Sequence, residues 1–498
     1  MTRESVVDTA DKASGEGLFS RRYATATATF AVVMFLEGFA ALAVLPTLPL
    51  AARQLDGVAL YPLVAGCFVA ASLIGGVIGG SWADRSGPYR PLAAGIGMAV
   101  VTLVISGTST TIWQLAAGRF LEGLTAGMIA VAVNTAVAHT FPDRLRPRAL
   151  ALMSTCWIVP SLIGPPLAGL VVAWSSWRTV FLGLAVLNVV PAIVVVVMLV
   201  RRARAAAPPK SAESPESPET LEKEKGPRPP LLIAVAVSLG AALAQFGVSA
   251  WDVPHLLSTG VGVTLLVMFA PRLLPRGTAR AAAGLPVTVL LRGLASGTYF
   301  TLEAFVPLLL DTERKVSPVQ TGIAFTAAAI AWAAGSWLQG KWLTHWPRHR
   351  TVTVGAVVMA AGLLVAVAGT FPATPPITSA VSLGVAALGM GMLTPSVTLL
   401  ALDHSPPGRE GATGNALQTT QNLGQIVVMG LAAALFNAGL SSPADPLVAY
   451  GATFGLLLVP AVLAAVLAVR ARTAGTADGA TGATTPVSVS VSAPASTG

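Results

Sequence analysis

The chain has 498 residues, of which 54% are hydrophobic and only 11% charged, with a mean hydropathy of +0.72. This composition is too apolar for a surface that faces water, so it excludes a soluble enzyme and a soluble binding module. The net charge of +9 does not indicate nucleic acid, because the basic residues gather in alternate connections between apolar stretches. The composition predicts an all-α membrane protein with many spans.

A membrane-spanning helix takes about 20 mostly apolar residues. Such stretches recur along the whole chain, and short polar connections separate them. We expect fourteen transmembrane helices, at residues 24–50, 60–80, 91–108, 112–138, 149–173, 178–200, 231–250, 254–271, 282–310, 318–340, 351–370, 376–398, 412–438 and 447–469. An even number of spans places both ends of the chain on one side of the membrane.

The 31 Lys and Arg residues test this topology. Two of them, Arg119 and Arg292, fall inside spans, and four fall in connections on one side: Arg53, Arg178, Arg314 and Lys315. All the others lie in the termini and in the alternate connections on the opposite side. The positive-inside rule therefore predicts that both termini are cytoplasmic. We expect a multi-pass protein of the plasma membrane, in a bacterium the inner membrane.

A shift of the chain by 255 residues aligns its two halves. Gly80-Ser81-Trp82 then matches Gly335-Ser336-Trp337, and Leu36-Glu37-Gly38 matches Leu291-Arg292-Gly293. Repeated halves around a central substrate site are a common way to build a secondary transporter. The expected organisation is a cytoplasmic segment at 1–23, a six-helix bundle at 24–200, a cytoplasmic linker at 201–230, an inserted helix pair at 231–271, a second six-helix bundle at 272–470 and a disordered cytoplasmic tail at 471–498. The two bundles are expected to be pseudo-symmetric.

The connection after the second span contains Gly80, Asp84, Arg85, Gly87 and Arg90. This spacing resembles the signature loop of the major facilitator superfamily. An acid at a helix end can pair with basic groups or with a helix dipole across the interface between halves. Pro88 and Tyr89 stand where the family usually has basic residues, so Arg90 is a candidate for that role. An ordinary surface ion pair in a short turn is the alternative.

Span four contains Arg119-Phe120-Leu121-Glu122-Gly123. It resembles a second motif of the superfamily, with Glu122 in place of an amide. Charged groups in hydrocarbon are expensive and normally face a cavity or a partner, so this pair is a candidate for proton coupling. Since residues three apart share a helix face, a self-neutralising structural pair is the alternative.

Span five contains Pro160 and then Gly164-Pro165-Pro166-Leu167-Ala168-Gly169. It resembles the antiporter motif of drug and proton antiporters, with Ala168 in place of a glycine. Prolines bend a helix and glycines permit close packing, so we expect a kinked contact at the interface between halves. A plain kink is the alternative.

The three motifs and the number of spans together resemble the fourteen-helix drug and proton antiporter branch of the superfamily. The resemblance covers the chain from the first span to Val469. It implies export of amphipathic, often cationic compounds, driven by inward movement of protons with alternating access. No Walker loop is present in the sequence, so ATP-driven pumping is not expected.

Glu37, Glu122 and Glu303 are the acids that lie well inside spans. Glu37 is near the middle of the first span and is the leading candidate for the proton carrier, because a carboxylate in a low-dielectric setting is readily protonated. A permanent structural pair is the alternative, with its repeat mate Arg292 as a possible partner across the cavity. Glu303 is expected at the cavity mouth or directed to water.

Polar and aromatic residues in several spans are candidates for lining a substrate cavity, although amides also form ordinary interhelical hydrogen bonds. They are Asn134, Phe305, Phe325, Trp332, Gln418, Gln421, Asn422 and Gln425. Neither Cys67 nor Cys156 is expected to form a disulfide, and the five histidines are too scattered for a metal site. No metal and no cofactor are expected.

Three other functions compete with drug export. A proton-coupled importer of the same fold is disfavoured by the motif at Gly164. An exporter dedicated to one metabolite or antibiotic fits every motif equally well. A membrane sensor or membrane-embedded enzyme would need an appended soluble domain or a cluster of catalytic groups. The expected partners are a small-molecule substrate, protons and membrane lipid, and we expect a monomer.

Overall fold

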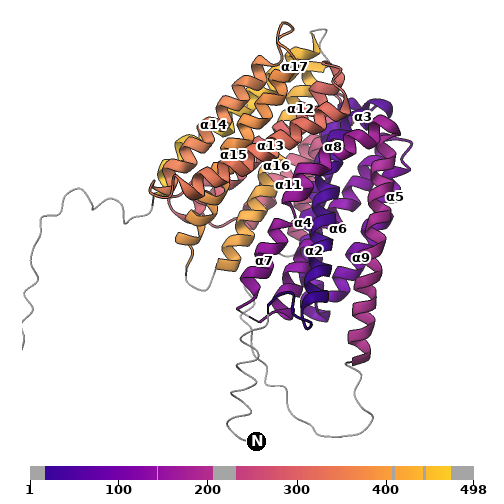
Figure 1. Cartoon of the computed structure of the whole chain (residues 1–498). Helices are drawn as coiled ribbons and strands as arrows, with labels where there is room; N and C mark the ends of the chain where they lie inside the picture. Colours follow the sequence, from indigo (N-terminus) through magenta and orange to yellow (C-terminus); the bar gives the residue numbers. More distant parts are fainter. Residues whose placement is uncertain (1–16, 143, 206–230, 407–409, 441–444, 473–498) are drawn as a thin grey trace, which may run out of the picture.

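The computed structural model describes residues 17–142, 144–205, 231–406, 410–440 and 445–472, and over these ranges the chain is helical with short connections (Figure 1). The expected linker at 206–230 and the tail from residue 473 lie outside the described residues. The prediction of an all-α membrane protein is confirmed.

The first half of the chain forms six apolar spans, two of which are broken. Their helices are α2 (Ala24–Ala43) with α3 (Leu48–Gln54), α4 (Tyr61–Ser86), α5 (Tyr89–Gly107), α6 (Ile112–Thr140), α7 (Arg146–Thr155) with α8 (Ile158–Trp174), and α9 (Trp177–Ala205). The inserted pair is α10 (Leu231–Gly247) and α11 (Val253–Phe269). The second half consists of α12 (Leu285–Thr312), α13 (Pro318–Lys341), α14 (Arg348–Ala368), α15 (Ile377–Asp403), α16 (Glu410–Leu440) and α17 (Pro446–Leu467).

The expected spans agree with these helices except for two breaks at prolines and the short length of α10. Within the described ranges, thirteen helical segments are long and apolar enough to cross a membrane, and α10, with 17 residues, is a shorter apolar helix. The first span is interrupted by a 3-10 turn at Leu45–Thr47, where Pro46 and Pro49 cannot donate hydrogen bonds. The fifth is interrupted before Ile158, because the ring of Pro160 clashes with a helical carbonyl four residues earlier.

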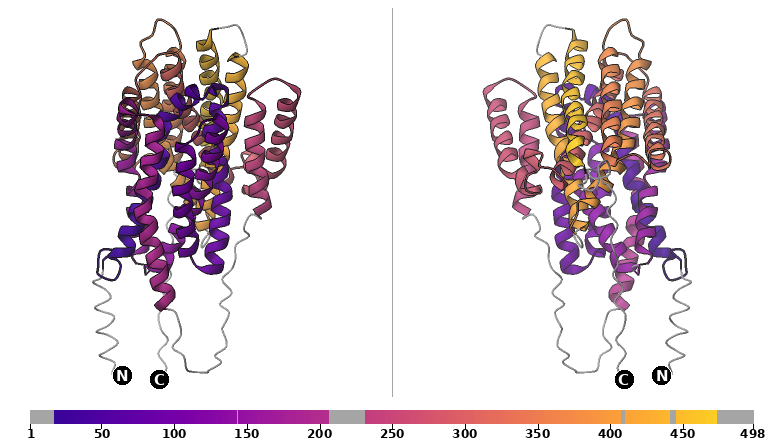
Figure 2. Two further views of the ribbon diagram at one scale, coloured as in Figure 1. Left: turned by 90° about the vertical axis from the view of Figure 1, so that its right-hand side faces the viewer. Right: turned by 90° about the vertical axis from the view of Figure 1, so that its left-hand side faces the viewer.

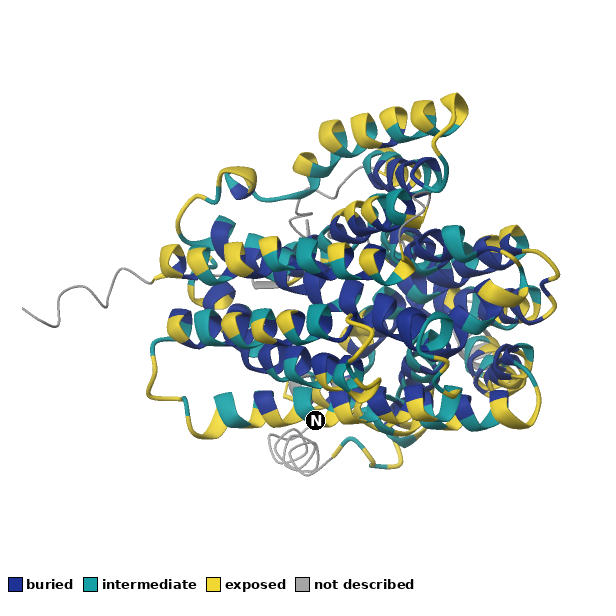
Figure 3. Ribbon diagram, turned by 90° about the horizontal axis from the view of Figure 1, so that it is seen from above, coloured by how far each residue is buried: buried dark blue, intermediate teal, exposed yellow. Residues whose placement is uncertain are grey.

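The helices form two bundles that follow the two halves of the sequence. In the first, α4 packs against α6, α5 against α6 and α9, and α2 against α8 and α9. In the second, α12 packs against α15, α16 and α17, while α15 also packs against α13 and α14. Exposed residues lie mainly on the outer rim and buried residues between the helices (Figure 3). The bundles are the two repeats expected from the sequence.

Two glycines that the sequence alignment pairs make equivalent contacts in the two bundles. A Cβ atom on Gly38 of α2 would lie 3.2 Å from the Trp157 side chain, directly before α8. A Cβ atom on Gly293 of α12 would lie 2.7 Å from the Thr420 side chain of α16. Since α8 and α16 occupy the same place in their repeats, the paired glycines face equivalent helices of the two bundles.

We call the side of the molecule on which α2 begins the near side and the opposite side the far side. Successive spans alternate in direction, so α12 and α16 also begin on the near side, as α2 does (Figures 1 and 2). The first span therefore begins on the near side, and the last span ends there. This matches the even number of spans expected from the sequence.

The inserted pair α10 and α11 stands beside the two bundles as a hairpin (Figure 2). On the far side, Asp252 caps α11 by accepting a hydrogen bond from the His255 backbone N–H and also contacts the His255 ring. These bonds hold the pKa of the exposed Asp252 carboxyl below its ordinary value. The helix α10 packs on α4 and also contacts α16. By contrast, only 6% of the membrane-spanning stretch of α11 is buried inside the protein.

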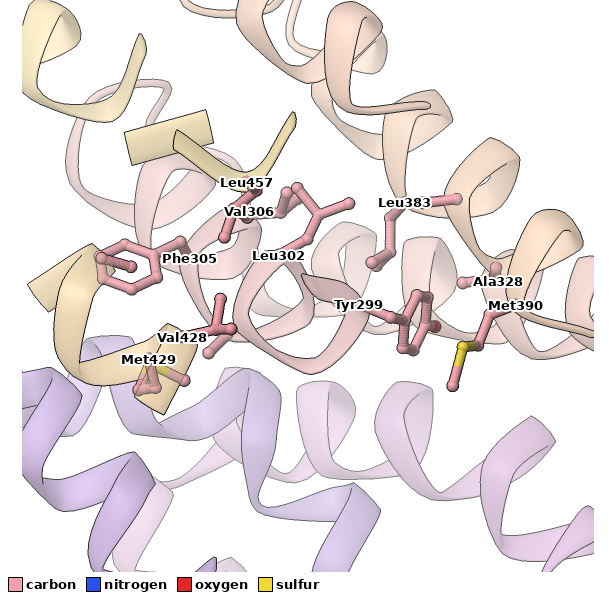
Figure 4. Packing of buried hydrophobic residues seen from close by; sticks show 14 of the residues in the cluster. Tyr299, Leu302, Phe305, Val306, Ala328, Leu383, Met390, Val428, Met429 and Leu457 are labelled. Atoms are coloured by element: carbon pink, nitrogen blue, oxygen red, sulfur yellow. The ribbon is translucent and has the colours of Figure 1, made fainter. Parts of the chain in front are cut away.

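The helix α12 is the centre of the second bundle. Of its membrane-spanning stretch, 89% is buried inside the protein, the largest share of any span in the described ranges. Figure 4 shows Tyr299, Leu302, Phe305 and Val306 of this helix pointing toward side chains of the surrounding helices. Because α12 has neighbours on every side, a polar residue on it faces protein rather than lipid.

Glycine packing between α12 and α16 can be tested with a matched pair on one helix. A Cβ atom on Gly424 would lie 2.0 Å from the Gly293 carbonyl oxygen, whereas one on Gly430 would meet no atom within 4 Å. We expect Gly424→Ala to lower the melting temperature of the purified protein, because the helices must move apart. Gly430→Ala should leave it unchanged or raise it slightly, because alanine favours helix over glycine by roughly 1 kcal/mol. Equal melting temperatures for the two variants would contradict this packing.

Candidate functional site

The two span acids of the first bundle, Glu37 and Glu122, border the same small cavity. Its lining comes from α2, α4, α5, α6 and α9, and it includes Arg119 and Asn188. The cavity volume is about 20 Å³, which suffices for a single water molecule but not for a drug-sized compound. In this arrangement the cavity can hold water for proton chemistry but has no room for a transported molecule.

Arg119 and Glu122 form a buried ion pair on α6. Arg119 Nη1 donates to Glu122 Oε2 at 2.6 Å, and the two residues are 2% and 6% exposed. The Ser106 hydroxyl of α5 donates to the other carboxylate oxygen, and the guanidinium lies 4.5 Å from the centre of the Phe68 ring. The pair is thus neutralised, hydrogen-bonded and stacked, which is what a buried charge pair needs to be tolerated.

Glu37 lacks such a partner. No hydrogen-bond or ion-pair partner of its carboxylate lies among the residues that the structure describes, although the side chain borders the cavity beside the Arg119–Glu122 pair. Its repeat mate Arg292 does not supply one, because Arg292 is bound within the second bundle. The contact across the cavity that the sequence suggested is not made in this structure.

Arg292 of α12 is held by Gln421 of α16. The guanidinium donates from Nε and Nη2 to the Gln421 amide oxygen, at 3.0 and 2.6 Å. The third nitrogen, Nη1, is buried and has no hydrogen-bond partner among the described residues. Arg292 and Gln421, both candidates from the sequence, are therefore brought together from the neighbouring helices α12 and α16.

Glu303 is buried within the second bundle and does not reach water. It is 7% exposed, and the Tyr299 hydroxyl lies 3.5 Å from its Oε1 atom. Both residues are on α12, one turn apart. The position is a polar site inside the bundle, rather than the exposed end of a span.

The motif from Gly80 to Arg90 is mostly helical. The helix α4 continues to Ser86 and ends at Gly87, whose φ of +78° is a conformation that glycine adopts without strain. Arg85 Nη2 donates to the Ser81 hydroxyl at 3.5 Å, and Arg90 is exposed in the first turn of α5. Asp84 is in the last turn of α4 on the near side. The connection itself is shorter than the sequence suggested.

The motif of span five lies where the two bundles cross. Pro165 and Pro166 are within α8, which packs closely against α13 of the second bundle. Because Pro166 has no N–H, the carbonyl of Leu162, four residues earlier, loses its helical donor. The Thr326 hydroxyl of α13 donates to that carbonyl oxygen at 2.6 Å. A proline on one bundle thus creates an acceptor that the other bundle satisfies.

Two glycines bring the backbones of α8 and α13 together at this crossing. A Cβ atom on Gly169 would lie 2.5 Å from the Pro318 carbonyl oxygen, and one on Gly322 would lie 2.5 Å from the Pro165 carbonyl oxygen. Gly164 instead faces Ala43 of α2, where a Cβ atom would be in ordinary contact. Gly169 therefore serves the contact between bundles, whereas Gly164 serves packing within the first bundle.

The bundles are also joined on the far side by residues that the sequence did not indicate. The Tyr61 hydroxyl donates to the Ala304 carbonyl at 2.6 Å, and its ring packs edge to face on Phe305. Arg53 and Asp311 form an ion pair at 3.4 Å. Asn437 donates to the carbonyls of Ala59 and Val248 at 3.1 and 3.0 Å, and so links both bundles to the end of α10. Only knowledge of the helix packing could have paired these residues.

The other cavity candidates fall into two groups. Phe305 and Phe325 are 0% and 4% exposed and pack in the core, and Trp332 packs on Tyr299. The polar group is more accessible: Asn134 and Gln418 are exposed, whereas Gln421, Asn422 and Gln425 are half-buried. Asn422 Nδ2 lies 3.5 Å from the Ser72 hydroxyl of α4, so the amide face of α16 meets the first bundle. No group of three or more residues suited to a metal ion occurs in the described ranges.

Two repeated six-helix bundles of apolar helices, packed on each other through α8 and α13, define a polytopic membrane protein. The family model of the Major Facilitator Superfamily matches residues 30–290 and 288–493. The chain belongs to this superfamily.

Relatives and solved structures agree with this assignment. The chain is 23% identical over 432 residues to the "Probable multidrug-efflux transporter Rv1634" of Mycobacterium tuberculosis, with 84% of this chain and 87% of the relative covered. It is similar in fold to a D-xylose-proton symporter (TM-score 0.59, 16% identity, 90% of this chain and 97% of that chain). It is also similar to a POT family transporter in complex with 5-aminolevulinic acid (TM-score 0.62, 13% identity, 89% and 94%). At these identities the structures support the fold alone.

The hydrogen bond between Thr326 and Leu162 predicts a difference between two variants. Thr326→Val keeps the shape of the side chain but leaves the Leu162 carbonyl without a donor, whereas Thr326→Ser keeps the hydroxyl. We expect Thr326→Val to destabilise the protein by about 1–3 kcal/mol, seen as a lower melting temperature, and Thr326→Ser to stay close to the native value. If valine and serine behave alike, the hydroxyl does not hold the crossing.

The ion pair on α6 predicts a strong coupling between its two members. Arg119→Gln leaves Glu122 buried without its cation, and we expect it to destabilise the protein by about 3 kcal/mol. The double variant Arg119→Gln/Glu122→Gln should recover most of this loss, because neither charge remains. The measurement is thermal unfolding of the native protein, both single variants and the double variant in one detergent. Additive effects would show that the two side chains act independently.

Proposed function

We propose that this protein is a secondary active exporter that moves amphipathic small molecules out of the cell in exchange for protons by alternating access. The observation that carries the proposal is the environment of Glu37. Its carboxylate borders a cavity inside the first bundle, next to a neutralised ion pair, and has no partner of its own among the residues that the structure describes. An unpaired carboxylate within a membrane span can bind and release a proton as access alternates.

The paired and unpaired acids suggest a division of roles. Glu122 is tied to Arg119 and Ser106, so its charge is compensated inside the protein. Glu37 is 85 residues earlier in the chain but borders the same cavity, where protonation would change the charge beside that pair. Glu303 with Tyr299 forms a second acidic position, in the other bundle. In this proposal Glu37 carries the coupled proton, and the Arg119–Glu122 pair positions it.

The charge distribution supports an orientation with the near side in the cytoplasm. Both termini are then cytoplasmic, since most Lys and Arg residues lie in the near-side connections. The contacts of Tyr61, Arg53 and Asn437 then lie on the outer side, so the two bundles are joined there in the described arrangement. Opening this side would require the α8–α13 crossing to rearrange, which gives Thr326 and Gly169 a part in alternating access.

The relatives favour export. The mycobacterial relative, which spans most of this chain, is named for multidrug efflux, and the motif at Pro165 lies at the interface that must move. The bundles at 24–200 and 272–470 would rock about this crossing in a monomer, with the pair at 231–271 attached at the side. We infer that the substrate lies between the bundles, because the cavity beside Glu37 is too small for it.

The decisive variant for proton coupling is Glu37→Gln. In inverted vesicles with an acidic interior, the native protein should accumulate amphipathic dyes as protons leave the vesicle. Glu37→Gln should reduce this gradient-driven accumulation by at least about ten-fold, because the amide cannot carry a proton. The same variant should still exchange dye inside for dye outside, since that exchange requires no proton. Retained exchange separates loss of coupling from loss of folding.

Glu313→Gln is the matched control, because it makes the same chemical change at the far end of α12, outside the cavity. It should accumulate dye as the native protein does. Native accumulation by Glu37→Gln would remove Glu37 as the carrier. Failure of the native protein to accumulate any dye, of either charge, would overturn export of amphipathic compounds by proton antiport.

A further inference from the structure

The two arginines inside spans have opposite electrostatic surroundings. Arg119 is paired with Glu122 at 2.6 Å. Arg292 has no carboxylate within ion-pair distance in the part of the chain that the structure describes, and its one recorded hydrogen-bond partner is the neutral amide of Gln421. A guanidinium remains charged at any physiological pH. Arg292 therefore places inside the membrane-spanning part of the second bundle a permanent positive charge that no described carboxylate compensates.

The geometry of Arg292 and Gln421 leaves only hydrogen-bond donors available. The amide oxygen of Gln421 already accepts two bonds from the guanidinium, so the free end of that side chain is its NH₂ group. Arg292 Nη1 is a second donor, and it has no partner among the described residues. A site with two donors and a positive charge is complementary to an anion with several oxygen acceptors. It is not complementary to a cation.

Arg292 lies toward the near side of the second bundle, and its unpartnered donor Nη1 is buried in the described arrangement. It is about two turns from the start of α12 and is half-buried rather than enclosed. Gln421 belongs to a polar face of α16 that includes Gln418, which is exposed, and Asn422, which meets α4 of the first bundle. This face thus runs from the accessible near end of α16 to the contact between the bundles.

We propose that Arg292 and Gln421 anchor the anionic group of the transported compound, so that the preferred substrates are amphipathic organic acids rather than lipophilic cations. This inference rests on the proposed export function and names its substrate class. The substrate carboxylate or phenolate supplies the counter-charge that the described residues do not provide for Arg292. The apolar part of the substrate lies between the bundles.

The contrast with Arg119 explains why the chain supplies a carboxylate in one bundle and an amide in the other. A glutamate at position 421 would neutralise Arg292 as Glu122 neutralises Arg119. A glutamine there positions the guanidinium through two hydrogen bonds but leaves its charge available. Gln421 is therefore a positioning residue, and Arg292 is the residue that binds the anion.

The test is direct binding of two dyes that share one ring skeleton and differ in charge. Fluorescein, at a pH where it is an anion, and rhodamine 123, a cation, are titrated with the full-length protein in detergent, and fluorescence anisotropy is recorded. The native protein should bind fluorescein more tightly than rhodamine 123. Arg292→Gln should weaken fluorescein binding by at least about ten-fold, because it removes a charge-assisted hydrogen bond.

Gln421→Glu is the second variant, and it keeps Arg292 in place. The new carboxylate should pair with the guanidinium, so fluorescein binding should be lost while the melting temperature is maintained or raised. This outcome distinguishes occupation of the anion site from misfolding. Fluorescein binding that is absent from the native protein, or unchanged in both variants, would overturn the inference.

The binding assay and the vesicle assay can fail separately. If the native protein accumulates rhodamine 123 in vesicles but does not bind fluorescein, proton-driven export stands and the anion site is wrong. If fluorescein binds through Arg292 but no pH gradient drives its accumulation, the anion site stands and proton antiport is wrong.

Discussion

The main-chain carbonyl of Leu162 needs a hydrogen-bond donor, and the contact between the two bundles provides it. Pro166 removes its helical donor, and no water is available in hydrocarbon to replace it, so a partner must come from the protein. Thr326 of the other bundle supplies the hydroxyl, and Gly169 and Gly322 let the two backbones come close enough. A helix defect in one repeat is thus stabilised by a side chain of the other. The far-side contacts of Tyr61 and Arg53 reinforce the same joined arrangement.

The charges inside the spans follow a similar division between bundles. In the first bundle a cation and an acid neutralise each other, and a second acid lies beside them over a small cavity. In the second bundle the cation is held by an amide, and the acid is buried beside a tyrosine hydroxyl. The repeats therefore share a backbone plan but carry different electrostatics. Such a difference allows one bundle to serve the proton and the other to serve the substrate.

Much of the architecture could be predicted from the sequence because membrane constraints are simple. The length of apolar stretches gave the helices, and the positions of Lys and Arg gave the parity. The helix breaks at Pro46 and before Pro160 follow from the geometry of proline. These prolines are visible in the sequence, but the expected spans were continuous helices. The second span was expected to end at residue 80, but the helix continues to Ser86 because it ends only where Gly87 takes a positive φ.

The site was less accessible to prediction because its contacts depend on how distant helices cross. Glu37, Arg119 and Glu122 could be singled out as charges in apolar surroundings, and two of them could be paired by their spacing. Nothing local to Thr326 shows that it meets Leu162, and nothing local to Gln421 shows that it holds Arg292. The cavity expected around Phe305 and Phe325 is instead core in this structure, because aromatic residues fill interiors as readily as they line cavities.

The two bundles meet along two seams, α4 with α16 and α8 with α13, and the inserted pair covers only the first of them. Along the seam of α4 and α16, α10 packs over the bundles, with the Ser238 hydroxyl donating to the Ala70 carbonyl at 2.5 Å. Along the seam of α8 and α13, Ile163, Leu167 and Ile323 are exposed apolar side chains that face the surrounding bilayer. An amphipathic compound dissolved in the membrane would meet a covered edge on one flank and a bare helix crossing on the other. The inserted hairpin thus covers one of the two contacts between the bundles and leaves the other exposed.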